Sequence, residues 1–116
     1  MKKIVPFIIV WLVLVLTGCD NPVIYTTDDG VTTIKEANVE ITFDINNQRL
    51  VIKNLNWNYA RIQIERLSDG SWLDIYNGSV GGGKTYEHTA YFQSGDQIAI
   101  TIKIEGEEWY PFFTLP

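Results

Sequence analysis

Reactive and metal-binding side chains are scarce in this sequence of 116 residues, which has one cysteine, Cys19, and one histidine, His88. A single cysteine cannot form an intramolecular disulfide, and one histidine cannot supply the several imidazole ligands of a typical metal-dependent hydrolase. A Ser–His–Asp triad would have to be built on His88, which lies in a segment that alternates like a strand, where a packed or surface histidine is the usual case. We therefore expect no catalytic residues, no metal site and no cofactor.

Long apolar runs are also scarce, and the longest lies at the N-terminus. The chain begins MKKIVPFIIVWLVLVLTGC, in which two lysines precede 13 uninterrupted apolar residues, 4–16. That run is shorter than the roughly 20 residues of a transmembrane helix and fits the core of a signal peptide. Its end, LTGC, resembles the lipobox of bacterial lipoproteins. The resemblance implies that a signal peptide, 1–18, is removed and that the thiol of Cys19 is joined to diacylglycerol; the alternative is an ordinary secretory signal with an accidental cysteine.

Residue 20 extends this resemblance. In enteric-type lipoproteins an acid directly after the lipidated cysteine keeps the protein in the inner membrane, and Asp20 stands at that position. We therefore expect a lipid anchor in the bacterial cell membrane on the exported side, facing the periplasm where the host has two membranes. Residues 19–37 are expected to form the lipidated cysteine and a polar tether, with at most one weak strand.

Basic residues are outnumbered by acidic ones. The chain has 9 Lys+Arg and 14 Asp+Glu, and removal of the signal peptide leaves seven basic against 14 acidic side chains. Such an acidic chain argues against nucleic acid as a partner and against an electrostatic grip on anionic lipid, so the acyl chains are expected to do the anchoring. The acids around Gly106 are expected to form a solvated turn; a loose calcium site there or at Asp28-Asp29 is the less favoured alternative.

From residue 38 to the C-terminus, apolar residues alternate with polar ones at a period of two, and no segment has the period of a helix. Turn signals separate seven short segments, expected to be strands over 39–45, 50–55, 61–65, 72–76, 85–92, 98–104 and 109–115. Pro111 indicates an edge position for the last one. This pattern predicts an all-β domain over 38–116, an antiparallel β-sandwich of about seven strands, immunoglobulin-like, with a small barrel as the alternative.

Residues 78–85, GSVGGGKT, match the phosphate-binding loop pattern G-x-x-x-x-G-K-[ST] letter for letter. Such a loop works between a parallel strand and a helix, whose N-terminal amides hold the phosphates. The segment that follows Lys84, TYEHTAYF, has the composition of a strand. We therefore expect no nucleotide binding, a flexible glycine-rich connection between strands, and a solvated side chain for Lys84.

The hairpin around Asp69-Gly70 carries the candidate binding face. With these residues as its two-residue loop, three cross-strand pairs follow, namely Leu67–Trp72, Glu65–Asp74 and Gln63–Tyr76. Ile62, Ile64, Leu73 and Ile75 would then face the core. The outward side would combine flat aromatic rings with hydrogen-bonding groups, which suits a sugar ring or a protein partner. Its members are Tyr59, Arg61, Gln63, Glu65, Trp72, Asp74 and Tyr76.

Two alternatives stay open for this face. The aromatic rings are also typical of side chains that cover their neighbours on the outside of a sandwich, and the sequence favours that interpretation. The like-charged pair Glu65–Asp74 is unfavourable unless a cation lies near. The leading hypothesis is a lipid-anchored, non-enzymatic module of the cell envelope whose β-sandwich binds a protein or glycan partner. The alternative is an acidic lipoprotein that inhibits a basic envelope enzyme, such as a lysozyme, with loop carboxylates in its cationic cleft.

Overall fold

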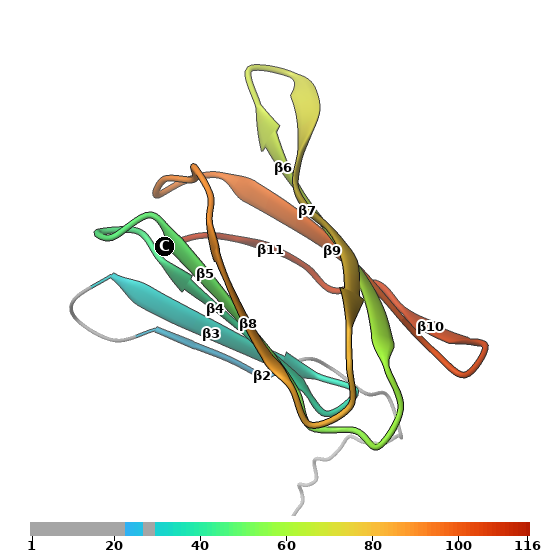
Figure 1. The fold of residues 1–116 in the computed structure, drawn as a ribbon. Coiled ribbons are helices and arrows are strands. Elements are labelled where there is room, and N and C mark those ends of the chain that lie inside the picture. Colours follow the sequence, from blue (N-terminus) through green and yellow to red (C-terminus); the bar gives the residue numbers. More distant parts are fainter. Residues whose placement is uncertain (1–22, 27–29) are drawn as a thin grey trace, which may run out of the picture.

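The computed structural model describes residues 23–26 and 30–116, and within them ten strands pack as two antiparallel sheets (Figure 1). The expected all-β antiparallel sandwich is confirmed, with ten strands in place of about seven. The signal peptide 1–18, Cys19, Asp20 and Asp28-Asp29 lie outside the described residues. Within the described part of the chain, no helix is long and apolar enough to cross a membrane.

The first sheet contains a meander of consecutive strands and one strand that returns from the second sheet. Its order is β2 (Val23–Thr26), β3 (Val31–Glu36), β4 (Val39–Asp44), β5 (Arg49–Asn54) and β8 (Thr85–Thr89). In the immunoglobulin order, by contrast, the second strand pairs with the fifth.

The second sheet is built around β9. Its order is β10 (Glu107–Trp109), β9 (Gln97–Ile104), β6 (Ala60–Ser68) and β7 (Ser71–Val80), and β11 (Phe112–Thr114) also pairs with β9. β10 and β11 follow one another along the same edge of β9, separated by Pro111. The edge position expected from Pro111 is therefore confirmed; proline has no N–H to donate to a further strand.

The sandwich begins earlier in the chain than expected. β3 pairs on both sides, with β2 and β4, and its Thr32 and Ile34 side chains are buried in the interior. The boundary at residue 38 is therefore wrong, because residues 31–37 belong to the domain and not to a tether. Thr33, on the other side of β3, is buried too and shares a 3.1 Å hydrogen bond with Thr42. Burial on both sides hides the period of two that marks a half-exposed strand.

The core fills the space between the sheets with branched aliphatic and aromatic side chains. Every second residue of β9 from Ile98 to Ile102 is buried, as the alternation predicts. Phe43 lies at the centre of an aromatic group, with its ring centroid 5.4 Å from that of Phe92 and 5.7 Å from that of Phe113, both in edge-to-face geometry. Edge-to-face contacts of this kind are the favoured arrangement of buried aromatic rings.

One end of the sandwich, here called the proximal end, is where the described chain begins. Val23 pairs with Lys35, close to the turn at Ala37-Asn38. The amide of Leu55 donates to the carbonyl of Asn38 (2.9 Å), which ties the β5–β6 loop, residues 55–59, to that turn. The opposite, distal end carries the β6–β7 turn and loop 90–96, and the β6–β7 hairpin projects beyond the rest of the sandwich there (Figure 1).

The glycine-rich stretch forms a close-packed turn at the proximal end rather than a flexible connection. The amide of Gly83 donates to the carbonyl of Asn54 (2.8 Å), and a Cβ at Gly82 would lie 2.0 Å from the carbonyl oxygen of Trp57. The next element is the strand β8, as expected, and the Lys84 side chain is exposed. The glycines are thus required by a close approach of two loops.

Candidate functional site

The β6–β7 hairpin follows the expected register near its turn and departs from it further along. Asp69 and Gly70 both have positive φ, as a two-residue primed turn requires, and the pairs Leu67–Trp72 and Glu65–Asp74 are confirmed. Beyond them β7 has one additional residue, Ile75, and the ladder resumes with Tyr76 opposite Ile64. The expected pair Gln63–Tyr76 is therefore wrong, because a β-bulge inverts the inward and outward positions of β7 from that point on.

The bulge removes Tyr76 from the candidate face. Cross-strand partners point to the same side of a sheet, so Tyr76 shares the inner side with the buried Ile64. Tyr59 precedes β6 at the proximal end and is separate from the hairpin. The residues that do share the outer side of the second sheet are Arg61, Gln63, Glu65, Trp72 and Asp74.

The inner side of the hairpin is only partly core. Ile62 and Ile64 are fully buried as expected, and Ile75 is half-buried. Leu73 points inward opposite Arg66 but stays 45% exposed, because this part of the hairpin projects past the body of the first sheet. Apolar side-chain surface is thus left uncovered on the inner side of β7.

The outer side has a second aromatic residue that sequence reasoning missed. Phe112 of β11 is 56% exposed, and its ring centroid lies 6.2 Å from that of Trp72, edge to face. Gln63 Nε2 donates to Asp74 Oδ1 over 3.3 Å. Neither Glu65 nor Asp74 takes part in the three ion pairs found among the described residues, Lys35–Glu40, Arg49–Glu87 and Arg66–Asp96. This face therefore combines two acids that lie outside those ion pairs with an exposed aromatic pair.

A different feature dominates the side of the sandwich between β7 and β8. These strands end the two sheets on the same side, and neither has a second strand partner among the described residues. They diverge from the β7–β8 loop toward the distal end, leaving a seam between the sheets (Figure 1). Both strands therefore present a free edge of backbone N–H and C=O groups.

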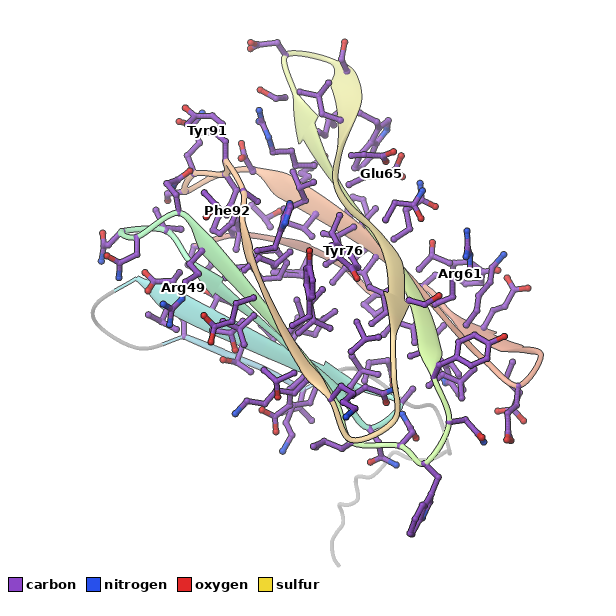
Figure 2. The ribbon with its side chains drawn as sticks, in the orientation of Figure 1. Arg49, Arg61, Glu65, Tyr76, Tyr91 and Phe92 are labelled. Carbon is purple, nitrogen blue, oxygen red and sulfur yellow. The ribbon has the colours of Figure 1, made fainter. Side chains whose placement is uncertain are left out.

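Three rings fill the seam nearer the proximal end. The Tyr76 side chain lies between β7 and β8 (Figure 2), with its centroid 5.2 Å from that of Tyr86 and 5.9 Å from that of His88. Tyr86 and His88 stack on each other at 6.0 Å. Burial, and to a lesser degree the neighbouring Tyr86, raises the pKa of the Tyr76 phenol above its ordinary value of 10.0. His88 is thus a packed residue of this cluster, as expected.

Nearer the distal end the seam opens into a cleft of about 390 Å³. We call it the seam cleft. Its walls come from both sheets and combine apolar, aromatic and charged side chains. The lining residues are Arg66, Leu73, Asp74, Ile75, His88, Thr89, Ala90 and Tyr91.

Arg66 is the unusual residue of the seam cleft, because it occupies an inward position of β6. Its side chain is only 10% exposed, Nη1 lies 3.5 Å from Asp96 Oδ2, and the guanidinium carbon stands 5.0 Å above the Tyr91 ring. The Nη1 nitrogen is buried, and its contact with Asp96 is an ion pair that lacks the geometry of a hydrogen bond among the described residues. Arg66 thus places a cation in the wall of the cleft, paired with Asp96 and stacked on Tyr91.

Asp96, the acidic partner of Arg66, is held in place by hydrogen bonds of its own loop. Asp96 Oδ2 accepts a hydrogen bond from the amide of Gln93 (2.9 Å), which closes the loop before β9. The backbone of Leu115 pairs with the same loop, donating to Asp96 O (2.9 Å) and accepting from Gly95 N (2.8 Å). The charged wall of the seam cleft is therefore organised before any ligand binds, which lowers the entropic cost of binding.

Sequence reasoning missed Arg66, Asp96 and Tyr91, although one signal for them exists. The inward positions of β6 are Ala60, Ile62, Ile64 and then Arg66, so a charge stands where the alternation calls for an apolar residue. Its partner Asp96 is 30 residues further along the chain and can be found only from the fold. The described residues bring together no group of three or more His, Cys, Asp or Glu side chains that could hold a metal ion.

Comparison with known proteins adds nothing to this geometry. No family model, no curated protein and no solved structure matches this chain.

Proposed function

We propose that this protein is a lipid-anchored, non-enzymatic module of the bacterial cell envelope that binds an extended segment of a protein partner in the seam cleft. The anchor is proposed at Cys19, from the lipobox at the end of the apolar run. The observation that carries the binding proposal is a preformed cleft between two strand edges, whose wall combines the exposed Leu73 with the Arg66–Asp96 ion pair. A carbonyl or carboxylate oxygen of the partner would approach the Arg66 guanidinium.

An extended peptide matches the seam better than a sugar does. The free edges of β7 and β8 offer main-chain hydrogen bonds to an added strand, while Leu73 and Ile75 offer apolar contacts to its alternate side chains. A glycan would need open aromatic faces for stacking. The rings of Tyr76, Tyr86 and His88 already pack on one another, which favours a protein as the partner.

Two adjacent residues of β7 allow a matched test. Leu73 lines the seam cleft and Trp72 lies on the outer side, and the two are almost equally exposed, at 45% and 44%. A photo-crosslinking amino acid at position 73 of the full-length protein in living cells is expected to capture a partner, whose linked peptide is then identified by mass spectrometry. A synthetic copy of that peptide should bind the wild-type protein, and Leu73→Glu should weaken binding about tenfold or more, since it places a charge in an apolar contact.

Trp72→Ala is the control and should leave the affinity for that peptide within about twofold of wild type, because it changes no residue of the cleft. Equal capture from positions 72 and 73, or a peptide that Leu73→Glu binds normally, would refute the seam cleft as the binding site. Melting temperatures of both variants, measured on the same preparations, separate loss of binding from loss of fold.

Inhibition of a basic envelope enzyme is the second candidate, and it is favoured by the outer face. Glu65 and Asp74 stand opposite each other, with no ion-pair partner in the part of the chain that the structure describes, beside the exposed rings of Trp72 and Phe112. Such a surface suits a cationic protein, whose affinity would fall steeply as ionic strength rises. Binding that depends strongly on salt and is weakened in Glu65→Gln, which lies outside the lining of the seam cleft, but kept in Leu73→Glu, would select this candidate over the first.

A further inference from the structure

The proximal end of the sandwich carries exposed apolar side chains that no contact within the domain explains. Trp57 is 99% exposed, and Leu55 and Tyr59 in the same loop are 57% and 65% exposed. Neither the core nor the seam cleft uses these residues. A tryptophan ring left entirely in water is unfavourable, which indicates that another surface covers it.

The loop that presents Trp57 is rigidly built. Asn54 is fully buried, and its side-chain amide donates to the carbonyls of Asn58 (2.8 Å) and Val80 (2.9 Å). The close approach of Gly82 to the Trp57 carbonyl fixes the loop from the other side. The backbone that carries Trp57 is therefore fixed, and the side chain projects from it into solvent.

The length of the chain between the proposed anchor and β2 limits how far the proximal end can lie from the membrane. Val23, the first residue of β2, lies at the proximal end, and only three residues separate it from Cys19. A fully extended chain advances at most about 3.6 Å per residue, so the Cα of the cysteine is within about 14 Å of that of Val23. The proximal end is consequently held within a short distance of the bilayer surface.

We propose that the proximal end rests on the membrane that holds the anchor, with Trp57 and Leu55 inserted among the lipid headgroups and Tyr59 beside them. Tryptophan and tyrosine are the residues that prefer the interface between headgroups and hydrocarbon. Glu105 lies at the same end and accepts a hydrogen bond from Asn58, so the apolar side chains, and not charge, would provide the attraction to the bilayer. The proposal rests on the proposed lipidation of Cys19.

Fluorescence quenching by brominated lipid tests the contact on the full-length lipoprotein, purified from bacterial membranes. The chain beyond the signal peptide has three tryptophans, Trp57, Trp72 and Trp109. Trp72→Phe/Trp109→Phe leaves Trp57 at the proximal end, and the matched control Trp57→Phe/Trp109→Phe leaves Trp72 on the distal hairpin. Each is reconstituted in vesicles of phosphatidylethanolamine and phosphatidylglycerol, with or without bromine on the acyl chains.

We expect brominated vesicles to quench Trp57 several-fold more than Trp72, and the emission of Trp57 to move to shorter wavelength on reconstitution. Equal quenching of the two residues would overturn the proposal. So would a Trp57 that is shielded from aqueous acrylamide only when other envelope proteins are added, because that result assigns the surface to a protein.

Acylation is measured separately, by vesicle flotation and by the mass of the N-terminal peptide. A chain without acyl groups would overturn the anchor and the membrane contact together. An acylated chain that floats with the vesicles but keeps an unquenched Trp57 would overturn the membrane contact alone and leave the anchor standing.

Discussion

Gly82→Ala distinguishes two interpretations of the stretch GSVGGGKT. The phosphate-loop interpretation makes Lys84 the important residue and Gly82 replaceable, and the sandwich makes Gly82 important and Lys84 replaceable. In the phosphate-binding pattern Gly82 is a free position, and Lys84 is the residue that contacts phosphate. In the sandwich, the added Cβ would lie 2.0 Å from the Trp57 carbonyl oxygen, which is backbone and cannot rotate away. The two loops must then move apart by more than 1 Å to reach ordinary contact distance, on the order of the 3.4 Å at which such contacts become normal.

The cost of that movement follows from what joins the two loops. Asn54 accepts a hydrogen bond from Gly83 N at 2.8 Å and donates to Val80 O at 2.9 Å, so separation strains both. Overpacking costs about 1–3 kcal/mol and a weakened buried hydrogen bond about 1 kcal/mol, which gives about 2–4 kcal/mol for the substitution. For a domain of roughly 100 residues this lowers the melting temperature by about 10–20 °C.

Two neighbours in the same stretch serve as controls. A Cβ at Gly81 would meet only the flexible Lys84 side chain, at 3.2 Å, and Lys84 itself is exposed. Gly81→Ala and Lys84→Ala are therefore expected to melt within about 3 °C of wild type, as surface changes usually do. Thermal unfolding followed by circular dichroism measures all three. A Gly82→Ala protein as stable as the controls would refute the close-packed turn, and saturable ATP binding that Lys84→Ala abolishes would restore the phosphate-loop interpretation.

Three further predictions concern the anchor and the acid stability. Cys19→Ser is expected to abolish incorporation of labelled palmitate and to leave an uncleaved or soluble chain; a variant that is still labelled would contradict lipidation at this residue. Asp20→Ser is expected to move the protein to the outer membrane of a host with two membranes, and an unchanged distribution on membrane fractionation would count against the retention signal. The side-chain hydrogen bond from Asn47 (2.8 Å) holds the pKa of the Asp44 carboxyl below its ordinary 3.8. The stability that Asp44 contributes is therefore present above pH 3.8, and it is lost as the pH falls through the lower pKa of the folded state. Asp44→Asn should therefore make the free energy of unfolding less dependent on pH below 3.8, and an acid limb identical to wild type would show that this hydrogen bond carries no stability.

Local chemistry in the sequence determines much of the hairpin and of the sandwich. Asp69-Gly70 predicts its turn because both residues accept positive φ, and the two pairs nearest the turn follow from it. The alternation of Ile98 to Ile102 predicts a half-buried strand for a similar reason. These features depend on residues close together in the chain, and sequence patterns report such relations well.

Contacts between residues that are far apart in the chain are harder to predict from the sequence. Ile75 has the same apolar character whether it occupies a regular position or a bulge, so nothing in the residues near it shows that Tyr76 changes sides. The seam exists because β7 and β8 both end their sheets, a property of the whole topology. Arg66 at an inward position was the available local sign of the cleft, and its meaning depends on Asp96 in a distant loop.

The two proposed surfaces lie at opposite ends of the same strands, and this arrangement has a consequence for how the protein works. β8 runs from Thr85, next to the glycine turn at the proximal end, to Thr89 in the wall of the seam cleft. If the proximal end rests on the bilayer, the cleft lies toward the other end of the sandwich, and the projecting β6–β7 hairpin extends further still from the lipid (Figure 1). A partner would then be met above the headgroups, where a soluble protein or the exposed segment of a membrane protein can reach the free edges of β7 and β8. If Cys19 carries the proposed anchor, the short chain between it and Val23 would limit rotation of the domain, and the orientation would follow from its length as well as from Trp57.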